Sequence, residues 1–106
     1  MEKQFWIYMI TNKPEGVLYI GVTSELVQRI WQHKERCVPG FTSRYNLDRL
    51  VYFEEHAEAE AAIRREKRLK FWRREWKLDL VRKFNPDWQD LYPVITGERS
   101  CGQAAG

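Results

Sequence analysis

Two short runs of aromatic and β-branched residues lie near the N-terminus, at 5–10 and 17–22, and a polar segment separates them. That segment, 11–16, reads TNKPEG and holds Asn, Pro and Gly, which are typical turn residues. Apolar runs flanking such a segment predict two strands joined by a turn.

The two faces of this predicted hairpin differ in chemistry. If 11–16 is the whole loop, Ile10 pairs with Val17, Tyr8 lies opposite Tyr19, and Trp6 lies opposite Gly21. Side chains alternate across a strand, so these residues share one face, while the other face is wholly apolar. The two phenols and the glycine are then either an aromatic pair packed for stability or a place that another group approaches closely.

A helix is expected next, from capping residues at 23–25 to about residue 36, before Val38-Pro39-Gly40. Leu26 and Ile30 form its inward stripe. Arg29 and His33 are four residues apart and therefore share a face beside that stripe. They fit either a structural pair or two groups that point into a shared cleft.

The remaining pattern alternates between short and long elements. It predicts a polar loop at 41–46 and a strand at 50–53, followed by a helix from 56 to about 72 and another from 73 or 74 to about 84. Asn85 and Pro86 should start a terminal turn at 86–91. The tail at 93–106 is expected to be disordered. The first long helix has an inward apolar stripe, and most of its charges can point outward. The second offers Trp76, Leu80, Val81 and Phe84 for packing.

One carboxylate breaks that division. Glu66 falls three residues after Ile63 and three before Leu69, which places it on the inward stripe of its helix. A charge at such a position is costly unless it is paired or holds a metal ion. An ion pair with a residue such as Arg29 and a role as metal ligand both remain open.

Length and composition restrict the class of protein. The chain has 106 residues, which fits one domain, and no apolar run approaches the roughly 20 residues that span a bilayer. The N-terminus lacks a signal-peptide layout. Cys37 and Cys101 are too few and too far apart for a disulfide framework or a zinc site, so we expect a cytoplasmic protein with no membrane association.

Basic residues are concentrated in one segment. Residues 64–83 hold ten Lys or Arg against three acids, whereas the whole chain has a net charge of only +3. This fits either a polyanion-binding surface, with Arg73 as a candidate phosphate contact, or a solvated helix face. Phe71, Trp72 and Trp76 lie within the segment, where they can stack on bases or form the apolar stripe of the same helices.

Taken together, these residues resemble the GIY-YIG nuclease family, in particular its small single-domain members. The tripeptides WIY at 6–8 and YIG at 19–21 correspond to the two signature motifs. An Arg ten residues after the second Tyr, a His four residues later, a Glu in the next long helix and an Asn after the last one follow in the family's order. The resemblance covers residues 5 to about 92, so the domain is expected at 1–92.

The resemblance implies an α+β fold, a three-stranded antiparallel sheet flanked by helices in the order β-β-α-β-α-α. It also implies a divalent-metal-dependent nuclease with Mg²⁺ or Mn²⁺ as cofactor. The implied catalytic residues are Tyr8, Tyr19, Arg29, His33 and Asn85, with Glu66 as metal ligand and Gly21 at the substrate. Of the two phenols, Tyr19 is expected as the base or its relay, Tyr8 as the group that positions water, and His33 as a second proton carrier.

Two positions depart from the family pattern. Trp6 replaces the first Gly of the signature, which we interpret as a packing change. Val22 follows YIG where many relatives have a Lys, and the missing cation is expected to weaken activation of Tyr19 unless another residue, such as Lys34 or Arg44, supplies it.

These features are compatible with three functions. The first is a metal-dependent endonuclease of low sequence specificity, acting on DNA in preference to RNA, in repair or recombination. The second is a non-catalytic nucleic-acid-binding module on the same fold. The third is a protein-interaction domain whose Trp-rich helices dock a partner. A homodimer or a recognition partner stays open, since the sequence predicts no second domain.

Overall fold

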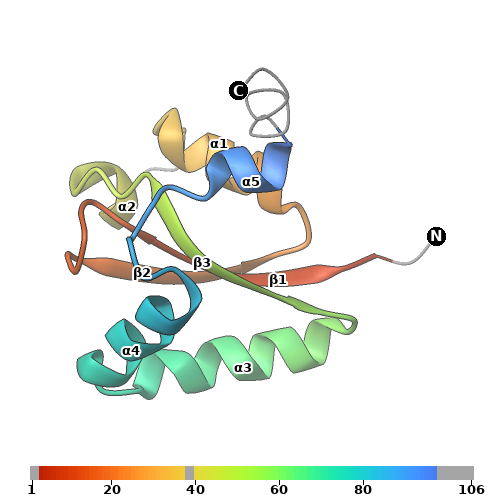
Figure 1. Cartoon of the computed structure of the whole chain (residues 1–106). Coiled ribbons are helices and arrows are strands. Elements are labelled where there is room, and N and C mark those ends of the chain that lie inside the picture. The colour runs from red at the N-terminus through yellow and green to blue at the C-terminus, as the bar shows by residue number, and fades with distance from the viewer. Residues whose placement is uncertain (1–2, 38–39, 98–106) are drawn as a thin grey trace.

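The computed structural model describes residues 3–37 and 40–97, and within them a three-stranded antiparallel sheet lies between two layers of helices (Figure 1). The strands are β1 (Phe5–Thr11), β2 (Leu18–Thr23) and β3 (Arg49–His56). They are arranged in the order β2-β1-β3, so β2 and β3 are the two edge strands.

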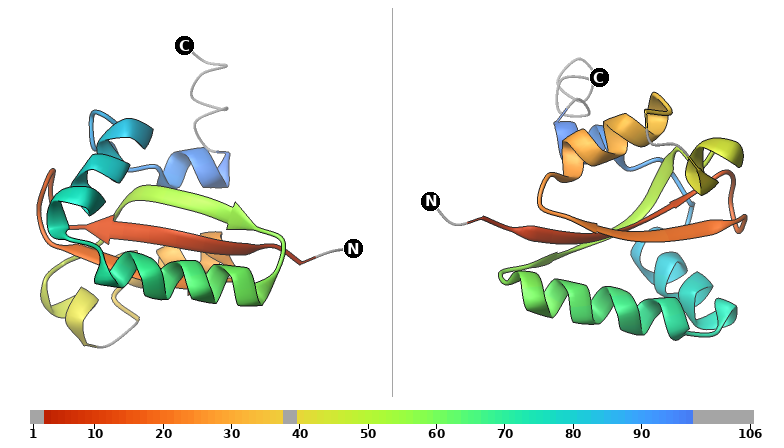
Figure 2. Two further views of the ribbon diagram at one scale, coloured as in Figure 1. Left: turned by 90° about the horizontal axis from the view of Figure 1, so that it is seen from below. Right: turned by 180° about the vertical axis from the view of Figure 1, so that it is seen from behind.

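Helices cover both faces of the sheet, as the two rotated views also show (Figure 2). One layer holds α1, α2 and α5, and the other holds α3 and α4 (Figure 1). Their bounds are α1 (Leu26–Lys34), α2 (Phe41–Arg44), α3 (Ala59–Phe71), α4 (Arg74–Phe84) and α5 (Tyr92–Thr96). The predicted α+β class, with an antiparallel sheet flanked by helices, is confirmed.

The hairpin register differs from the expected one by two residues. Tyr8 lies opposite Gly21, not Tyr19, and Thr11 lies in β1 opposite Leu18. The polar groups of the turn explain this shift. The Asn12 Oδ1 accepts a hydrogen bond of 3.1 Å from the Val17 backbone N–H, which closes the loop one residue later at each end than expected.

The predicted faces survive this error, because only an odd shift exchanges the two sides of a strand. We call the core between the sheet and the layer of α3 and α4 the lower core. The wholly apolar face of the hairpin packs there, through Ile7, Met9 and Ile20. Tyr8 and Ile10 belong to the second core, under α1, with Tyr19 partly buried beside them. The hairpin therefore presents both phenols to the layer that holds α1.

Three further expectations need correction. Residues 41–44 form the short helix α2 where a polar loop was expected. The turn expected over 86–91 is confined to Pro86 and Asp87, with the Trp88 backbone N–H donating to the Asn85 carbonyl at 3.0 Å. The tail expected to be disordered from residue 93 begins instead with α5, which packs against α1. Residues 98–106, the rest of that predicted tail, lie outside the described residues.

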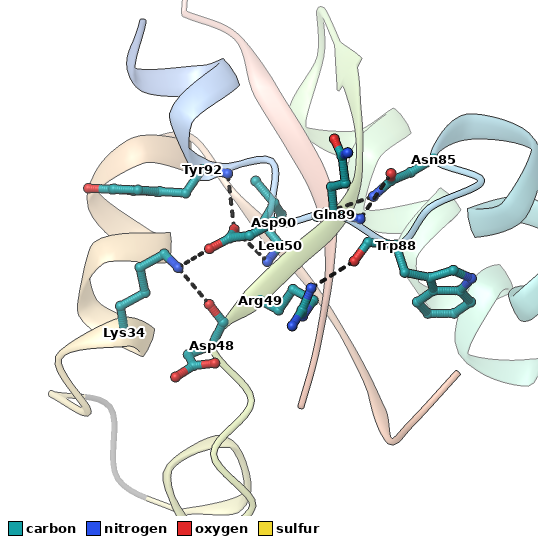
Figure 3. Close-up of polar contacts among 9 residues, drawn as sticks. All are labelled: Lys34, Asp48, Arg49, Leu50, Asn85, Trp88, Gln89, Asp90 and Tyr92. Atoms are coloured by element: carbon teal, nitrogen blue, oxygen red, sulfur yellow. Dashed lines mark hydrogen bonds and ion pairs between the residues drawn. The ribbon is translucent and has the colours of Figure 1, made fainter. Parts of the chain in front are cut away.

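The segment between α4 and α5 is bound along the outer edge of β3 (Figure 3). The Leu91 backbone N–H donates to the Leu50 carbonyl at 2.7 Å, and the Arg49 side chain donates to the Trp88 carbonyl at 3.0 Å. The Asp90 carboxylate accepts from the backbone N–H groups of Leu50 and Tyr92. This segment joins α4 in one helical layer to α5 in the other, and these contacts fix it against the edge of the sheet.

Within the described part of the chain, no helix has both the length and the hydropathy needed to cross a membrane. Cys37 is exposed and carries a free thiol. Cys101, the other cysteine of the sequence, lies outside the described residues.

Candidate active site

A buried chain of hydrogen bonds connects the first signature tyrosine to α1 and α2. The Tyr8 hydroxyl lies 3.0 Å from His33 Nε2, and His33 Nδ1 lies 3.1 Å from the Thr42 hydroxyl. All three residues are buried. Because a neutral imidazole has one donor and one acceptor nitrogen, one hydroxyl donates to the ring and the other accepts from it.

Gly21 allows Tyr8 to take this position. A Cβ atom at residue 21 would lie 2.4 Å from both Cζ and the hydroxyl oxygen of Tyr8, far inside van der Waals contact. The phenol therefore lies directly over the glycine backbone of the neighbouring strand. The close approach that the glycine suggested is, in this structure, made by the protein's own Tyr8.

Tyr19 completes a cluster of three rings. Its centroid lies 6.4 Å from that of Tyr8 and 5.8 Å from that of His33, and the Tyr8 and His33 centroids are 5.7 Å apart. Tyr8 is almost fully buried, whereas Tyr19 is partly exposed. Of the two phenols, Tyr19 is the one that a substrate can reach.

Two charged side chains act on this cluster. Burial is the main cause that raises the pKa of Tyr8; Tyr19 and Glu66 raise it further, and the Arg29 guanidinium opposes them. Burial also lowers the pKa of His33 to about 4, and Arg29 adds to that shift. At neutral pH, Tyr8 is therefore protonated and His33 is uncharged.

Glu66 belongs to the opposite helical layer and acts on Tyr8 through its charge. It lies on α3, which packs against β2 and β1, and it is only 9% exposed. Its ion-pair partner is Lys70 on the next turn of the same helix, with 2.6 Å between Lys70 Nζ and Glu66 Oε2, and not Arg29. The predicted burial of Glu66 is thus observed, with a different partner from the one suggested.

Asn85 occupies a separate part of the fold (Figure 3). Its side-chain amide donates to the carbonyls of Val51 and Gln89 at 3.2 and 2.9 Å, and its oxygen accepts from the Gln89 backbone N–H. Val51 is the extra residue of a bulge in β3, the strand farthest from β2. In this structure Asn85 stabilises the start of the β3-bound segment and does not join the ring cluster.

The cations suggested as substitutes for a lysine at position 22 lie elsewhere. Lys34 donates to the Asp48 carbonyl at 2.9 Å and forms an ion pair with Asp90, so its charge is already engaged (Figure 3). Arg44 is exposed at the end of α2. Arg73 is exposed just before α4, with its guanidinium 5.5 Å from the centre of the Trp76 ring. Val22 packs on the lower core, on the face opposite the two tyrosines.

Thr42 is the one member of the hydrogen-bonded chain that the sequence did not single out. It lies in the segment expected to be a loop, nine residues after its partner. A signal was present, because a buried histidine needs a partner for each ring nitrogen and the segment holds two hydroxyl residues, Thr42 and Ser43.

The donor set around Glu66 restricts the kind of metal ion that fits. Among the described residues, no group of three or more His, Cys, Asp or Glu side chains could enclose an ion. Mg²⁺ does not require such a cage, since it usually keeps several waters and is bound through one or two carboxylates plus a substrate phosphate. Within residues 3–37 and 40–97, the buried Glu66 carboxylate has one ion-pair partner, a half-exposed lysine, and such a carboxylate fits that requirement.

Comparison with known protein families identifies the class of domain. The model of the GIY-YIG catalytic domain matches residues 4–79, a span that includes both signature strands, α1 and α3. The chain belongs to the GIY-YIG family, whose catalytic domain is a nuclease domain. No curated protein and no solved structure gives a match.

The buried, neutral His33 predicts a pH dependence of stability. Its folded pKa of about 4 lies below the ordinary value of 6.5, so between these values the unfolded chain binds a proton that the folded chain does not. The stabilisation that depends on an uncharged His33 is therefore complete above pH 6.5. The free energy of unfolding falls by roughly 2–3 kcal/mol as the pH drops towards 4. The groups around the ring are Tyr8, Tyr19, Arg29 and Thr42.

Urea unfolding between pH 4.5 and 7.5 measures this effect, with His33→Gln as the comparison. The variant should lose most of the slope between pH 5 and 6.5. Proton NMR of the imidazole offers an independent check, and a His33 resonance that titrates near 6.5 would show this account of the site to be wrong.

Proposed function

We propose that this protein is a divalent-metal-dependent endonuclease that hydrolyses phosphodiester bonds in DNA, with low sequence specificity. The observation that carries the proposal is the Tyr8–Tyr19–His33 cluster, on which the charges of Arg29 and Glu66 both act. Such hydrolysis needs a nucleophile, neutralisation of charge on the phosphate and a route for protons. The five side chains can supply these three requirements.

In this proposal, Arg29 holds the scissile phosphate. A guanidinium offers a planar set of N–H donors that matches phosphate oxygens, and it keeps its charge at any working pH. Arg29 lies on α1, partly exposed, one turn before His33. It can therefore contact a phosphate next to Tyr19 while its charge stabilises negative charge on either phenol.

The two phenols take different roles. The raised pKa of Tyr8 keeps its phenol protonated at neutral pH, so the hydroxyl can donate a hydrogen bond but is not available as a base. We propose that the Tyr8 hydroxyl donates a hydrogen bond to His33 Nε2. His33 Nδ1–H then donates a hydrogen bond to the Thr42 hydroxyl. The more exposed Tyr19 then serves as the base or relay that accepts the proton of the attacking water, and Tyr8 orients that water.

Glu66 is the proposed ligand of Mg²⁺ or Mn²⁺. When bound, such an ion supplies Lewis-acid stabilisation of the charge that develops on the phosphate. Lys70 is half-exposed and can move from the carboxylate into solvent. Asn85 is assigned here to stabilising the fold around β3, on the basis of its three hydrogen bonds to backbone.

A second candidate is a non-catalytic nucleic-acid-binding module on the same fold. Val22 favours it, because the position after YIG carries no cation and Lys34 is engaged by Asp90. As the biological role of the endonuclease, we propose DNA repair or recombination in the cytoplasm. The exposed free thiol of Cys37 is compatible with a reducing compartment.

A substrate panel tests the proposal. Purified protein is incubated with Mg²⁺ and end-labelled single-stranded, duplex and branched DNA, with the matching RNAs alongside. We expect cleavage of at least one DNA substrate at many sequence positions. Salt-sensitive binding with no cleavage of any substrate would support the non-catalytic module instead.

A further inference from the structure

Two aromatic side chains that the core does not use, Phe71 and Trp76, are exposed near the corner where α3 is followed by α4, a corner whose backbone is visible in Figure 1. Phe71, the last residue of α3, is 91% exposed, and Trp76 in the first turn of α4 is 50% exposed. The core-facing residues of α4 are Leu78 and Val81. Single exposed apolar residues are ordinary, but exposed rings in one short segment, one of which lines a groove, indicate an interaction site.

A groove lies beside these rings. It measures about 350 Å³ and is lined by Trp72, Trp76, Asp79, Leu80 and Lys83. Trp72 is partly buried against the lower core, and its ring meets that of Trp76 edge-on, with 6.0 Å between centroids. One indole is thus fixed by packing and supports the other. We call Phe71 and the residues that line the groove, Trp72, Trp76, Asp79, Leu80 and Lys83, the tryptophan corner.

Cations surround the tryptophan corner. The Arg65 guanidinium lies 5.4 Å from the centre of the Trp72 ring, and that of Arg73 lies 5.5 Å from the centre of the Trp76 ring. The segment 64–83, which contains the corner, holds ten basic residues against three acids. The charge therefore favours a polyanionic occupant over a neutral or basic one.

Lys70 connects the corner to the candidate active site. Its Nζ pairs with Glu66, and its backbone carbonyl accepts a hydrogen bond of 3.3 Å from Lys77, one residue beyond Trp76.

We propose that the tryptophan corner binds unpaired nucleotides of the nucleic-acid substrate, with bases stacked on Phe71 and Trp76 and phosphates held by Arg73 and Lys77. The ligand class rests on the proposed function, which takes nucleic acid as substrate. Bases in a duplex are already stacked on each other, so only unpaired bases offer a free face to an aromatic ring. The corner then selects substrates with a single-stranded segment beside the cleaved bond.

Equilibrium binding without turnover tests this inference. Fluorescence anisotropy is measured in EDTA with the full chain, a short labelled single strand of mixed sequence, and the duplex of the same sequence. Trp76→Ala and Phe71→Ala should each weaken single-strand binding about tenfold, while duplex binding changes by less than about twofold. Trp76→Phe should restore most of the affinity, because it keeps an aromatic face.

Trp31 provides a matched control. It is 48% exposed on α1, in the other helical layer, so Trp31→Ala removes a similarly exposed indole outside the corner. We expect it to leave both affinities unchanged. Circular dichroism melting of each variant shows whether the fold is retained.

Three results would overturn the inference: unchanged single-strand binding in both corner variants, equal losses for single strand and duplex, or displacement of the single strand by poly-glutamate at equal charge concentration. Cleavage together with any of these three results would remove the inference and leave the proposed function. Binding that depends on Trp76 with no cleavage of any substrate would remove the proposed function alone.

Discussion

Replacing Glu66 with Gln is expected to lower the rate of nucleic-acid cleavage by about a thousandfold, because it removes the charge that holds the metal ion and keeps the side chain's shape. The fold should survive, since Lys70, the ion-pair partner of Glu66, is half-exposed and regains water when the pair is lost. Single-turnover cleavage with saturating Mg²⁺ measures the loss, and urea unfolding checks the stability of the variant.

Glu60→Gln is the matched control for that experiment. Glu60 is an exposed acid in the first turn of the same helix, so its replacement removes an equal charge away from the ring cluster. The control should cleave at the wild-type rate. Retention of more than about a tenth of the activity in Glu66→Gln would argue against Glu66 as the metal ligand.

The second large effect is expected at Gly21. In Gly21→Ala the new methyl group would lie 2.4 Å from the Tyr8 ring, so the ring must move and its 3.0 Å hydrogen bond to His33 is broken. Overpacking of this kind costs about 1–3 kcal/mol of stability. Displacing a positioned catalytic group by about an ångström should lower cleavage by about a hundredfold.

Val22→Ala separates these two consequences. Val22 is the next residue in β2 but packs on the lower core, away from the tyrosines, and its truncation costs stability without moving Tyr8. Unfolding and single-turnover cleavage are measured for both variants. A Gly21→Ala protein that loses no more activity than Val22→Ala would show that the position of the Tyr8 ring does not matter for catalysis.

Much of this fold can be predicted from short-range pattern. Alternation places both tyrosines on one face of the hairpin, and this holds although the register was wrong by two residues, because an even shift preserves the faces. The register itself depends on the Asn12 side chain, which closes the turn through the Val17 backbone. Composition identifies a turn but does not specify which polar group closes it.

In the candidate site, too, contacts within one helix follow from local pattern, and contacts between distant residues do not. Helical spacing predicts that Glu66 is buried, and its pairing with Lys70 is an i,i+4 contact within one helix. The engagement of Lys34 by Asp90 joins residues 56 positions apart. Such a contact follows from the path of the segment along β3, which no local pattern specifies (Figure 3). Asn85 was assigned by order in the family motif, and that order carries no information on its three backbone partners.

The central claim is that the tyrosine–histidine cluster, Arg29 and Glu66 together form one metal-dependent hydrolytic site. Its most direct test is the rate of strand cleavage by the wild-type protein with Mg²⁺, divided by the rate for the same sample with excess EDTA. We predict clear cleavage with Mg²⁺, or with Mn²⁺ in its place, and none above background with EDTA. Equal rates in the two conditions would contradict the account.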